Sequence, residues 1–310
     1  IAGSYTHIGG AVGNAKGGAV ISDIVSCVNI SGDSAAKHVG GVVGSSEGLS
    51  GALTVSKCLY SGTIDLPHVS DCLGGVMGYA NDLVTLSYCG FTGRVTGQAD
   101  GHVGGVLGYI NNANFGGLEN SFSAGQTNRA ALIGTVRACS DSIKNCFYSV
   151  GATPFGGSGA SNHHAESVSE WKTGRAAYLL NGGLYDNTYI WRQTIGEDDF
   201  PNFRGDVVYR NGKDSFTSEK PSAFLFFDGD ILTAEQVERS CVLIAASYGG
   251  DGRLIDVKMK DISGNTAITL DEMDLNRQEA SRICAMLWSN RETMTPLCRA
   301  AEYETVQKQK

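Results

Sequence analysis

Short apolar runs alternate with glycine and small polar residues along the first half of the chain, and they recur at a nearly fixed interval. One recurring string has an aliphatic residue, two glycines, two apolar residues and a further glycine. Its copies are residues 8–13, 39–44, 73–78, 103–108 and, in decayed form, 129–134. Self-similarity at about this period is typical of solenoids, in which each repeat forms one coil that stacks on its neighbours.

A second string alternates with the first and places an aliphatic residue three positions before a cysteine, or in one copy a serine. Its copies are residues 24–27, 55–58, 86–89, 118–121 and 143–146. Short Val, Ile and Leu runs bounded by Gly, Ser and Asn favour strands and tight turns. Residues three apart face opposite sides of a straight strand, so both can point inward only if the chain bends between them. We expect such a bend or bulge.

The pattern changes after the repeats. Residues 168–181 predict a short amphipathic helix, ended by Gly182, within a cap over residues 151–204 that covers the strand edges of the last coil. Residues 205–222 predict a linker. Over residues 223–310, the runs 241–248 and 254–259 flank a glycine-rich turn and predict a hairpin in a β-sandwich.

These patterns define the expected fold class. The chain is predicted to be all-β: an elongated β-solenoid, or β-helix, over residues 1–150 with a short helical cap, plus a small antiparallel β-sandwich domain. The chain opens on Ile1 with repeat material from residue 7, so we expect a piece of a longer protein.

Composition narrows the classes of function. Gly is abundant at 42 residues, and the formal net charge of −8 argues against a nucleic-acid partner. No apolar run reaches the length of a membrane span, so no membrane insertion is expected in this fragment. The nine cysteines are an odd number and form no CxxC pair, which favours neither a disulfide framework nor a zinc site of the usual spacing.

The two alternating strings resemble the GLUG motif, a repeat of large bacterial surface proteins and adhesins. The resemblance covers about residues 6–150, with Ser121 in place of cysteine in the fourth copy and Ala130-Ala131 in place of two glycines in the fifth. It implies an extracellular, cell-surface location and a role in adhesion. It brings no catalytic residues.

A second resemblance covers roughly residues 240–298. The run Ala246-Ser247-Tyr248 and the later segments 252–254, 285–288 and 294–297 are similar to an accessory β-sandwich module. Such modules end extracellular proteins and glycan-degrading enzymes of Gram-positive bacteria. The resemblance implies a role in spacing or assembly and leaves a binding role open.

Candidate metal ligands occupy the position before each Gly-Gly string: His7, His38, Cys72 and His102. Imidazole and thiol together suit a soft divalent metal. The alternative is an outward ladder of side chains with no ligand. The acidic runs 197–199 and 228–230 offer hard oxygens for Ca²⁺, with solvated loops as the alternative. The cysteines of the second string are interpreted as small buried hydrophobes.

Candidate binding residues are the aromatics near turns, Tyr60, Tyr79, Tyr109 and Phe115, which could stack on sugar rings if exposed. The alternative is that they cover the coil surface. The acidic residues Asp65, Asp71, Asp82 and Asp100 lie at different phases of the repeat, so no convergent catalytic pair is predicted.

The leading functional hypothesis is a non-catalytic adhesion or scaffold fragment of a larger bacterial surface protein. Its partner would be a glycan or a host or cell-surface protein. One alternative is a carbohydrate-binding module of an extracellular enzyme. Another is a β-helical polysaccharide lyase or glycosidase, for which a cluster of acidic residues on one face would be the signature.

Overall fold

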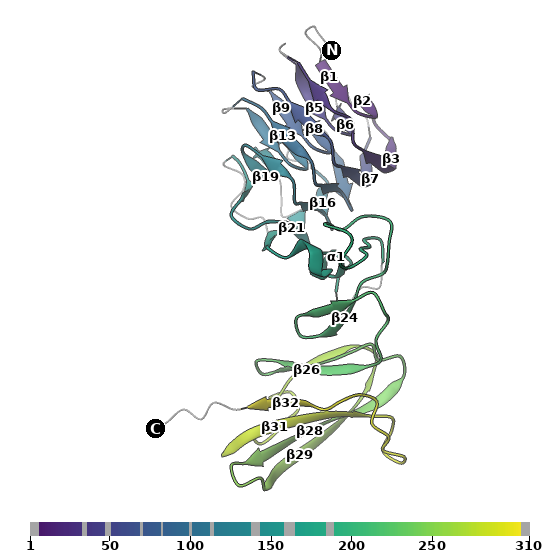
Figure 1. Cartoon of the computed structure of the whole chain (residues 1–310), viewed down its shortest axis with the longest axis vertical. Coiled ribbons are helices and arrows are strands. Elements are labelled where there is room, and N and C mark those ends of the chain that lie inside the picture. The colour runs from purple at the N-terminus through teal and green to yellow at the C-terminus, as the bar shows by residue number, and fades with distance from the viewer. Residues whose placement is uncertain are drawn as a thin grey trace. The chain divides into compact units, whose positions relative to one another are not determined.

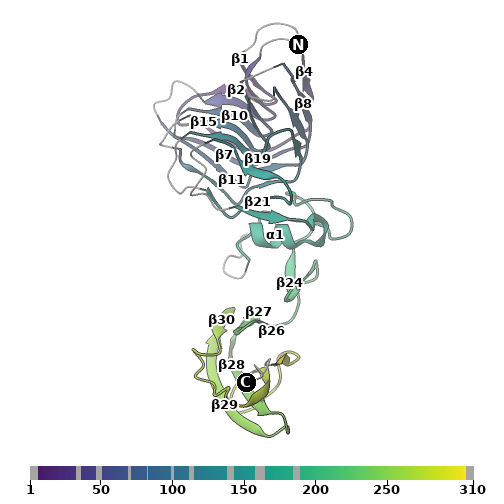
Figure 2. The same cartoon turned by 90° about the vertical axis from the view of Figure 1, so that its left-hand side faces the viewer.

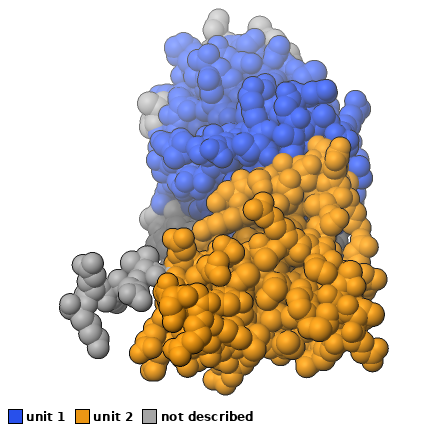
Figure 3. Space-filling view, turned by 60° about the horizontal axis from the view of Figure 1, so that its bottom comes forward, with its two compact units in different colours: residues 1–182, 188–206 blue, residues 183–187, 207–310 orange. Residues whose placement is uncertain are grey.

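A computed structural model describes residues 6–32, 36–46, 51–68, 71–81, 83–98, 101–111, 115–137, 143–157, 165–183 and 189–304. The chain divides into two compact units, residues 1–182 with 188–206, and residues 183–187 with 207–310 (Figure 3). Within the described residues, none of the helices has both the length and the apolar character that a membrane crossing requires.

The first unit is a parallel β-solenoid, as predicted (Figure 1). In its described residues, one sheet joins in spatial order β1 (Thr6–Gly9), β5 (Lys37–Gly40), β9 (Cys72–Gly74), β14 (His102–Gly104), β19 (Ala130–Val136), β15 (Leu107–Ile110), β10 (Met77–Ala80), β6 (Val43–Ser46) and β2 (Val12–Ala15), with β22 (Thr153–Phe155) beside β19. We call it sheet A.

Two further sheets complete the coils in the described part of this unit (Figure 2). Sheet B joins β20 (Ile143–Lys144), β16 (Gly117–Glu119), β11 (Val84–Ser87), β7 (Leu53–Tyr60), β12 (Gly90–Phe91), β17 (Phe122–Ser123), β21 (Cys146–Ser149) and β23 (Ala165–Val168), with β3 (Val20–Ser26) beside β7. Sheet C joins β18 (Gln126–Thr127), β13 (Arg94–Thr96), β8 (Thr63–Asp65) and β4 (Ile30–Ser31).

The Gly-Gly strings stack in the register that the repeat predicts. Val39 pairs with Leu73, and Leu73 pairs with Val103 on the next coil. All three side chains are fully buried in the core that runs through the coils. The glycines permit close backbone approach, because a Cβ on Gly75 would lie 2.1 Å from the carbonyl oxygen of Gly105.

The expected bend in the second string is present. Lys57 and Tyr88 adopt left-handed φ values of 49° and 54°, so the chain turns just before the cysteine. As a result Val55 and Cys58, three residues apart, are both fully buried. The structure buries the two side chains equally.

The predicted alignment of the first copy of the second string, residues 24–27, with the later copies is wrong. Ile21 pairs with Val55 and Ile24 pairs with Cys58, so the residues that match the later copies are 21–24. Asp23, with φ of 59°, supplies the bend in this coil. Cys27 therefore lies beyond the bend and is exposed. An isoleucine meets the need for an apolar side chain at the cysteine position, which the spacing to a cysteine could not reveal.

The segment after the last coil packs against the solenoid and contains one short helix. Asn145 Nδ2 of the last coil donates to the carbonyl oxygen of Leu179 at 3.0 Å, and Trp171 Nε1 donates to the Ser149 hydroxyl at 3.1 Å. Trp191 reaches the preceding coil, where its Nε1 donates to the carbonyl oxygen of Asn120 at 2.8 Å. The predicted helix over residues 168–181 is shorter than expected: a 3-10 turn, η2 (Trp171–Thr173), precedes α1 (Arg175–Leu180). Gly174, with φ of 85°, separates the two.

The second unit contains antiparallel sheets that enclose a separate apolar core. One sheet joins β26 (Phe224–Asp228), β27 (Ile231–Glu235) and β30 (Thr266–Thr269), and another joins β29 (Leu254–Ser263), β28 (Ser240–Gly249), β31 (Ala280–Trp288) and β32 (Ala301–Glu304). The predicted hairpin is confirmed as β28 and β29. Within the predicted linker, β24 (Tyr209–Gly212) and β25 (Ser215–Thr217) form a hairpin. Arg210 of this hairpin pairs with the buried Glu235 at 3.1 Å.

Candidate functional site

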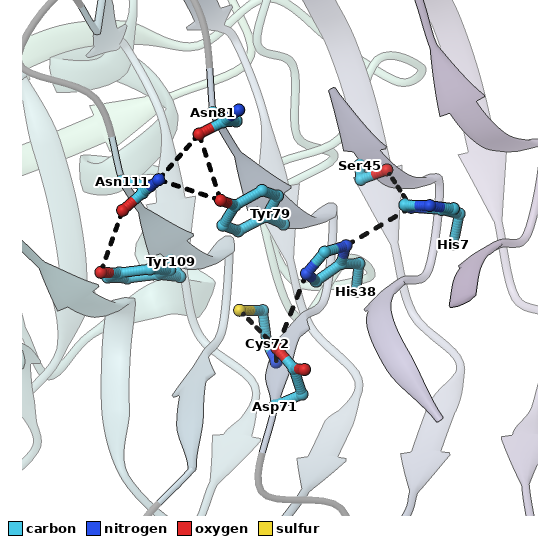
Figure 4. Close-up of polar contacts among 9 residues, drawn as sticks. All are labelled: His7, His38, Ser45, Asp71, Cys72, Tyr79, Asn81, Tyr109 and Asn111. Atoms are coloured by element: carbon cyan, nitrogen blue, oxygen red, sulfur yellow. Dashed lines mark hydrogen bonds and ion pairs between the residues drawn. The ribbon is translucent and has the colours of Figure 1, made fainter. Parts of the chain in front are cut away.

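Polar and aromatic side chains form adjacent columns on the outer side of sheet A, and we call this surface the His–Tyr strip (Figure 4). Its members are His7, His38, Cys72, His102, Asn14, Ser45, Tyr79, Tyr109, Thr135, Asn81 and Asn111. One column precedes the Gly-Gly strings and another follows their last glycine. The close turn at each glycine pair brings the columns together: a Cβ on Gly44 would lie 2.9 Å from the carbonyl oxygen of His38.

Three side chains converge at one point of the strip (Figure 4). The His38 Nε2 atom lies 3.7 Å from Asp71 Oδ1, and the Cys72 thiol donates to the same oxygen at 3.0 Å. Asp71 Oδ1 also accepts from the backbone N–H of Cys72 at 2.9 Å. The His38 side chain is 15% exposed and that of Asp71 28% exposed. Among the described residues, this is the group of His, Cys or acidic side chains whose ligand atoms all lie within 4.8 Å.

The imidazole of His38 is held on two further sides. Its ring stacks on Tyr79 with centroids 4.2 Å apart and 7° between the planes. Its Nδ1 atom lies 3.4 Å from His7 Nδ1, and His7 Nδ1 lies 2.6 Å from the Ser45 hydroxyl. His38 has a left-handed φ of 50°, a conformation in which histidine is enriched among non-glycine residues. The ring is therefore positioned by three neighbouring coils.

A hydrogen-bonded ladder continues the strip. The Tyr79 hydroxyl donates to Asn81 Oδ1 at 3.1 Å, and Asn111 Nδ2 donates to both the Tyr79 hydroxyl and Asn81 Oδ1, at 3.0 and 2.7 Å. Tyr109 donates to Asn111 Oδ1 at 3.3 Å. The polar groups of one coil thus bond to those of the next, which ties neighbouring coils together.

The other two predicted metal ligands, His102 and His7, do not join this cluster. His102 pairs in register with Cys72 but stacks on Tyr109 at 4.3 Å, and its Nδ1 lies 2.8 Å from the Thr135 hydroxyl. Burial is the main reason why the pKa of His102 lies below its ordinary value. His7 contacts the Nδ1 atom of His38, whereas the Nε2 atom of His38 is the one that faces Asp71. The Nδ1 atom of His7 and the Nε2 atom of His38 therefore do not point at the same position. The sequence missed Asp71 because it precedes the column by one residue; its position beside Cys72 was the available signal.

The four predicted sugar-stacking residues differ in their burial: two are buried and two are half-buried. Tyr60 and Phe115 are buried, 0% and 3% exposed, so the expectation that they lie exposed is wrong. The Tyr60 hydroxyl crosses to the neighbouring coil and donates to the carbonyl oxygen of Val28 at 2.8 Å. Tyr79 and Tyr109 are half-buried members of the strip, and each has one ring face stacked on a histidine.

The buried cysteines of the second string, Cys58, Cys89 and Cys146, are structural in their contacts. The Cys146 thiol donates to the carbonyl oxygens of Leu118 and Lys144, both at 3.3 Å. Ser121 occupies the same column, and its hydroxyl donates to the carbonyl oxygen of Glu119 at 2.7 Å. Burial raises the pKa of the Cys146 thiol to about 12 and that of Cys89 well above its usual range. Burial thus favours the protonated form of both thiols.

The acidic runs predicted as Ca²⁺ ligands have protein partners. Asp228 pairs with Lys213 at 2.8 Å and Asp199 with Lys172 at 2.6 Å. Asp230 pairs with Arg277 at 2.9 Å. Each of these carboxylates already faces a cation, which opposes binding of a second cation at the same oxygens. Asp82 and Asp100, predicted not to converge with Asp65 and Asp71, lie outside the described residues.

Comparison with known proteins gives no family identity: no protein-family model matches the chain, and no curated protein matches it. The chain's own fold is a parallel β-solenoid followed by small antiparallel sheets.

Proposed function

We propose that the chain is a non-catalytic adhesion or scaffold module of a larger bacterial surface protein, with a solenoid built from GLUG-type repeats. The supporting observation is the coil-to-coil bonding on the outer side of sheet A. There, Asn111 Nδ2 donates across coils to the Tyr79 hydroxyl and to Asn81 Oδ1. Such bonding favours a stiff, regular surface, which is the kind of surface that solenoid proteins use to bind large partners.

The alternation of the two repeat strings supports the same proposal. The Gly-Gly string forms the strands of sheet A and the cysteine string forms the bends and strands of sheet B. Both strings are thereby explained by coil formation and burial. Within the described residues, the acidic side chain that joins a cluster of potential ligands does so with a histidine and a cysteine, whereas glycosidases commonly pair two carboxylates.

The test has a catalytic arm and a binding arm, both with the whole chain. In the first arm, the protein is incubated with a panel of acidic and neutral polysaccharides, and new reducing ends and unsaturated products are measured. We expect none above the level of the Asp71→Asn variant. Cleavage by the parent chain that Asp71→Asn abolishes would overturn the proposal and favour a β-helical enzyme.

In the binding arm, the folded chain is applied to arrays of glycans and of host surface proteins. We expect saturable binding to one class of partner. Substitutions on the outer side of sheet A, such as Asn111→Ala, should weaken it, while Arg291→Ala in the second unit should not. Binding that only second-unit substitutions weaken would instead favour a binding role for the antiparallel unit.

A carbohydrate-binding module is the second candidate, and one observation favours it. Tyr79 and Tyr109 pair in register on neighbouring coils, with their ring centroids 5.8 Å apart. Both are half-buried and lie beside amide groups that can bond sugar hydroxyls. If sugars bind here, Tyr109→Ala should abolish a glycan-array signal that the buried-site variant Tyr60→Phe retains. An equal signal from both variants would reject this site.

A further inference from the structure

His38, Asp71 and Cys72 have the chemistry and spacing of an incomplete tetrahedral metal site. Zinc binds cysteine sulfur at about 2.3 Å, histidine nitrogen at about 2.0–2.1 Å and carboxylate oxygen at about 2.0–2.2 Å. Tetrahedral bonds of these lengths place the ligand atoms roughly 3.2–3.8 Å from one another. Here the nitrogen and the sulfur lie 3.7 and 3.0 Å from the shared carboxylate oxygen. All three ligand atoms lie within 4.8 Å of one another, close to the spacing of a tetrahedral site.

The surroundings of His38 match those of a metal-binding histidine. Such a histidine binds the metal through one nitrogen while a hydrogen-bond partner at the other nitrogen fixes its orientation. His38 turns Nε2 toward Asp71 and Nδ1 toward His7 Nδ1, 3.4 Å away. Tyr79 stacks on its ring and restrains rotation. The preference of the ring for this orientation is therefore established before any ion arrives.

We propose that His38, Asp71 and Cys72 bind a divalent transition-metal ion, with zinc as the best match, on the outer side of sheet A. A thiolate, an imidazole and a carboxylate are a mixed set that suits zinc and disfavours the hard cations Ca²⁺ and Mg²⁺. Three protein ligands leave a fourth position for water or for a group from a partner. This proposal goes beyond the scaffold role, which neither requires nor excludes it.

The ligands come from different coils, so the ion would join them. His38 lies on β5, Cys72 begins β9, the adjacent strand of sheet A, and Asp71 immediately precedes that strand. The binding of the ion requires the thiol to lose its proton, so binding releases a proton. Because an unfolded chain does not hold the three ligands together, binding should also raise the thermal stability of the solenoid.

The test uses Co²⁺, which substitutes for zinc and reports its ligands by absorption, with Zn²⁺ competition to give the affinity. We expect the parent chain to bind one equivalent with the visible bands of a tetrahedral site and a near-ultraviolet thiolate-to-cobalt band. Asp71→Asn and His38→Gln should weaken binding more than about 100-fold, since loss of an outer-shell partner alone costs 10–100-fold. His7→Ala, which removes such a partner, should weaken it about 10–100-fold.

Matched controls make the outcome decisive. His102→Gln changes the register partner of Cys72, and Cys27→Ser removes an exposed thiol; both should bind like the parent chain. Cys72→Ser should lose the thiolate band, with folding checked by circular dichroism because Cys72 is only 2% exposed. Absence of cobalt bands in the parent chain would overturn the proposal. So would bands that persist in Asp71→Asn and His38→Gln.

Discussion

In the solenoid unit a buried side chain faces the equivalent position of the next coil, whereas in the antiparallel unit it faces an unrelated part of the sequence. Val39 meets Leu73, its counterpart one repeat later. In the second unit, Leu243 meets Leu287, and no repeat relates them. Sequence self-similarity therefore contains three-dimensional information about the first unit that the second unit does not offer. The same difference governs how each unit should respond to substitution.

Glycine shows the contrast most directly, and Gly75→Val should have the largest effect. A Cβ at Gly75 would lie 2.1 Å from the Gly105 oxygen and 2.4 Å from Phe91 Cδ2, so neighbouring coils cannot stay in register. We expect a loss of more than about 4 kcal/mol in the free energy of unfolding of the solenoid. Gly250→Ala, where a Cβ meets nothing within 4 Å, should change the second unit by less than about 0.5 kcal/mol.

Urea denaturation followed by circular dichroism and tryptophan fluorescence measures both variants. The second unit should keep its own transition in Gly75→Val. If the solenoid transition of Gly75→Val matched that of the parent chain, the tight coil stacking would be wrong.

Cavities in the two cores should lower the free energy of unfolding by similar amounts, but their effects should extend over different parts of each unit. Leu86 and Leu243 are both fully buried, so each leucine-to-alanine change should cost about 2–5 kcal/mol. In a solenoid each coil contacts only its neighbours, so Leu86→Ala should speed amide hydrogen exchange mainly in β7, β11 and β16. Leu243→Ala should speed exchange throughout its unit. Exchange that rises uniformly through the solenoid would contradict this distinction.

Thiol reactivity sharpens the comparison within the solenoid. Cys27 is exposed, whereas Cys89 and Cys146 are buried, so alkylation of the native chain should label Cys27 first and the other two only after unfolding. The folded pKa of Cys146, about 12, exceeds its ordinary value of 9.0. Its stabilising contribution is thus complete below pH 9 and is lost as the pH rises from about 9 to about 12.

Mass spectrometry of timed alkylation, with urea melts between pH 8 and 11, checks both statements. Equal labelling of Cys27 and Cys146 in the native chain would show that the bend does not bury its thiol.

Exposed ion pairs should contribute least to the free energy of unfolding, and by similarly small amounts in both units. Lys144 pairs with Glu119 at 3.9 Å on the solenoid, and Arg291 pairs with Asp261 at 2.8 Å in the second unit. All four side chains are well exposed, so Lys144→Ala and Arg291→Ala should each cost less than about 1 kcal/mol. The shift of the urea midpoint gives the value. A cost above 2 kcal/mol in either unit would mean that its surface is far less solvated than described.

The sequence was sufficient to predict the features that recur at a fixed spacing in the repeats. The Gly-Gly strings predicted the pairing of His102 with Cys72, and the geometry of a strand predicted the bend that Lys57 and Tyr88 supply. The first copy of the cysteine string failed because Ile24 can fill the buried position as well as a thiol does. Spacing to a particular residue type is thus a weaker guide than the need for burial.

The sequence predicted which backbone positions pair between coils, but not which side chains contact one another there. The exposure predicted for Tyr60 depended on which way the chain faced after the bend, and the bend turns that ring inward. Asp71 joins His38 because adjacent coils stack, although the two residues are far apart in the chain. The predicted metal column contained two of the three converging side chains but could not show that a residue outside it completes the group.

The central claim is that the coils stack in register. Disulfide cross-linking between the first two coils tests this claim most directly. In a Cys27→Ser background, one variant carries Ser22→Cys with Ser56→Cys, and the other carries Val25→Cys with Ser56→Cys. Ser22 and Ser56 are register partners on adjacent strands, whose spacing of about 4.8 Å suits a disulfide. The account predicts that mild oxidation links the first pair and leaves the second pair reduced. Linkage of the second pair without the first would contradict it and restore the register suggested by the cysteine string.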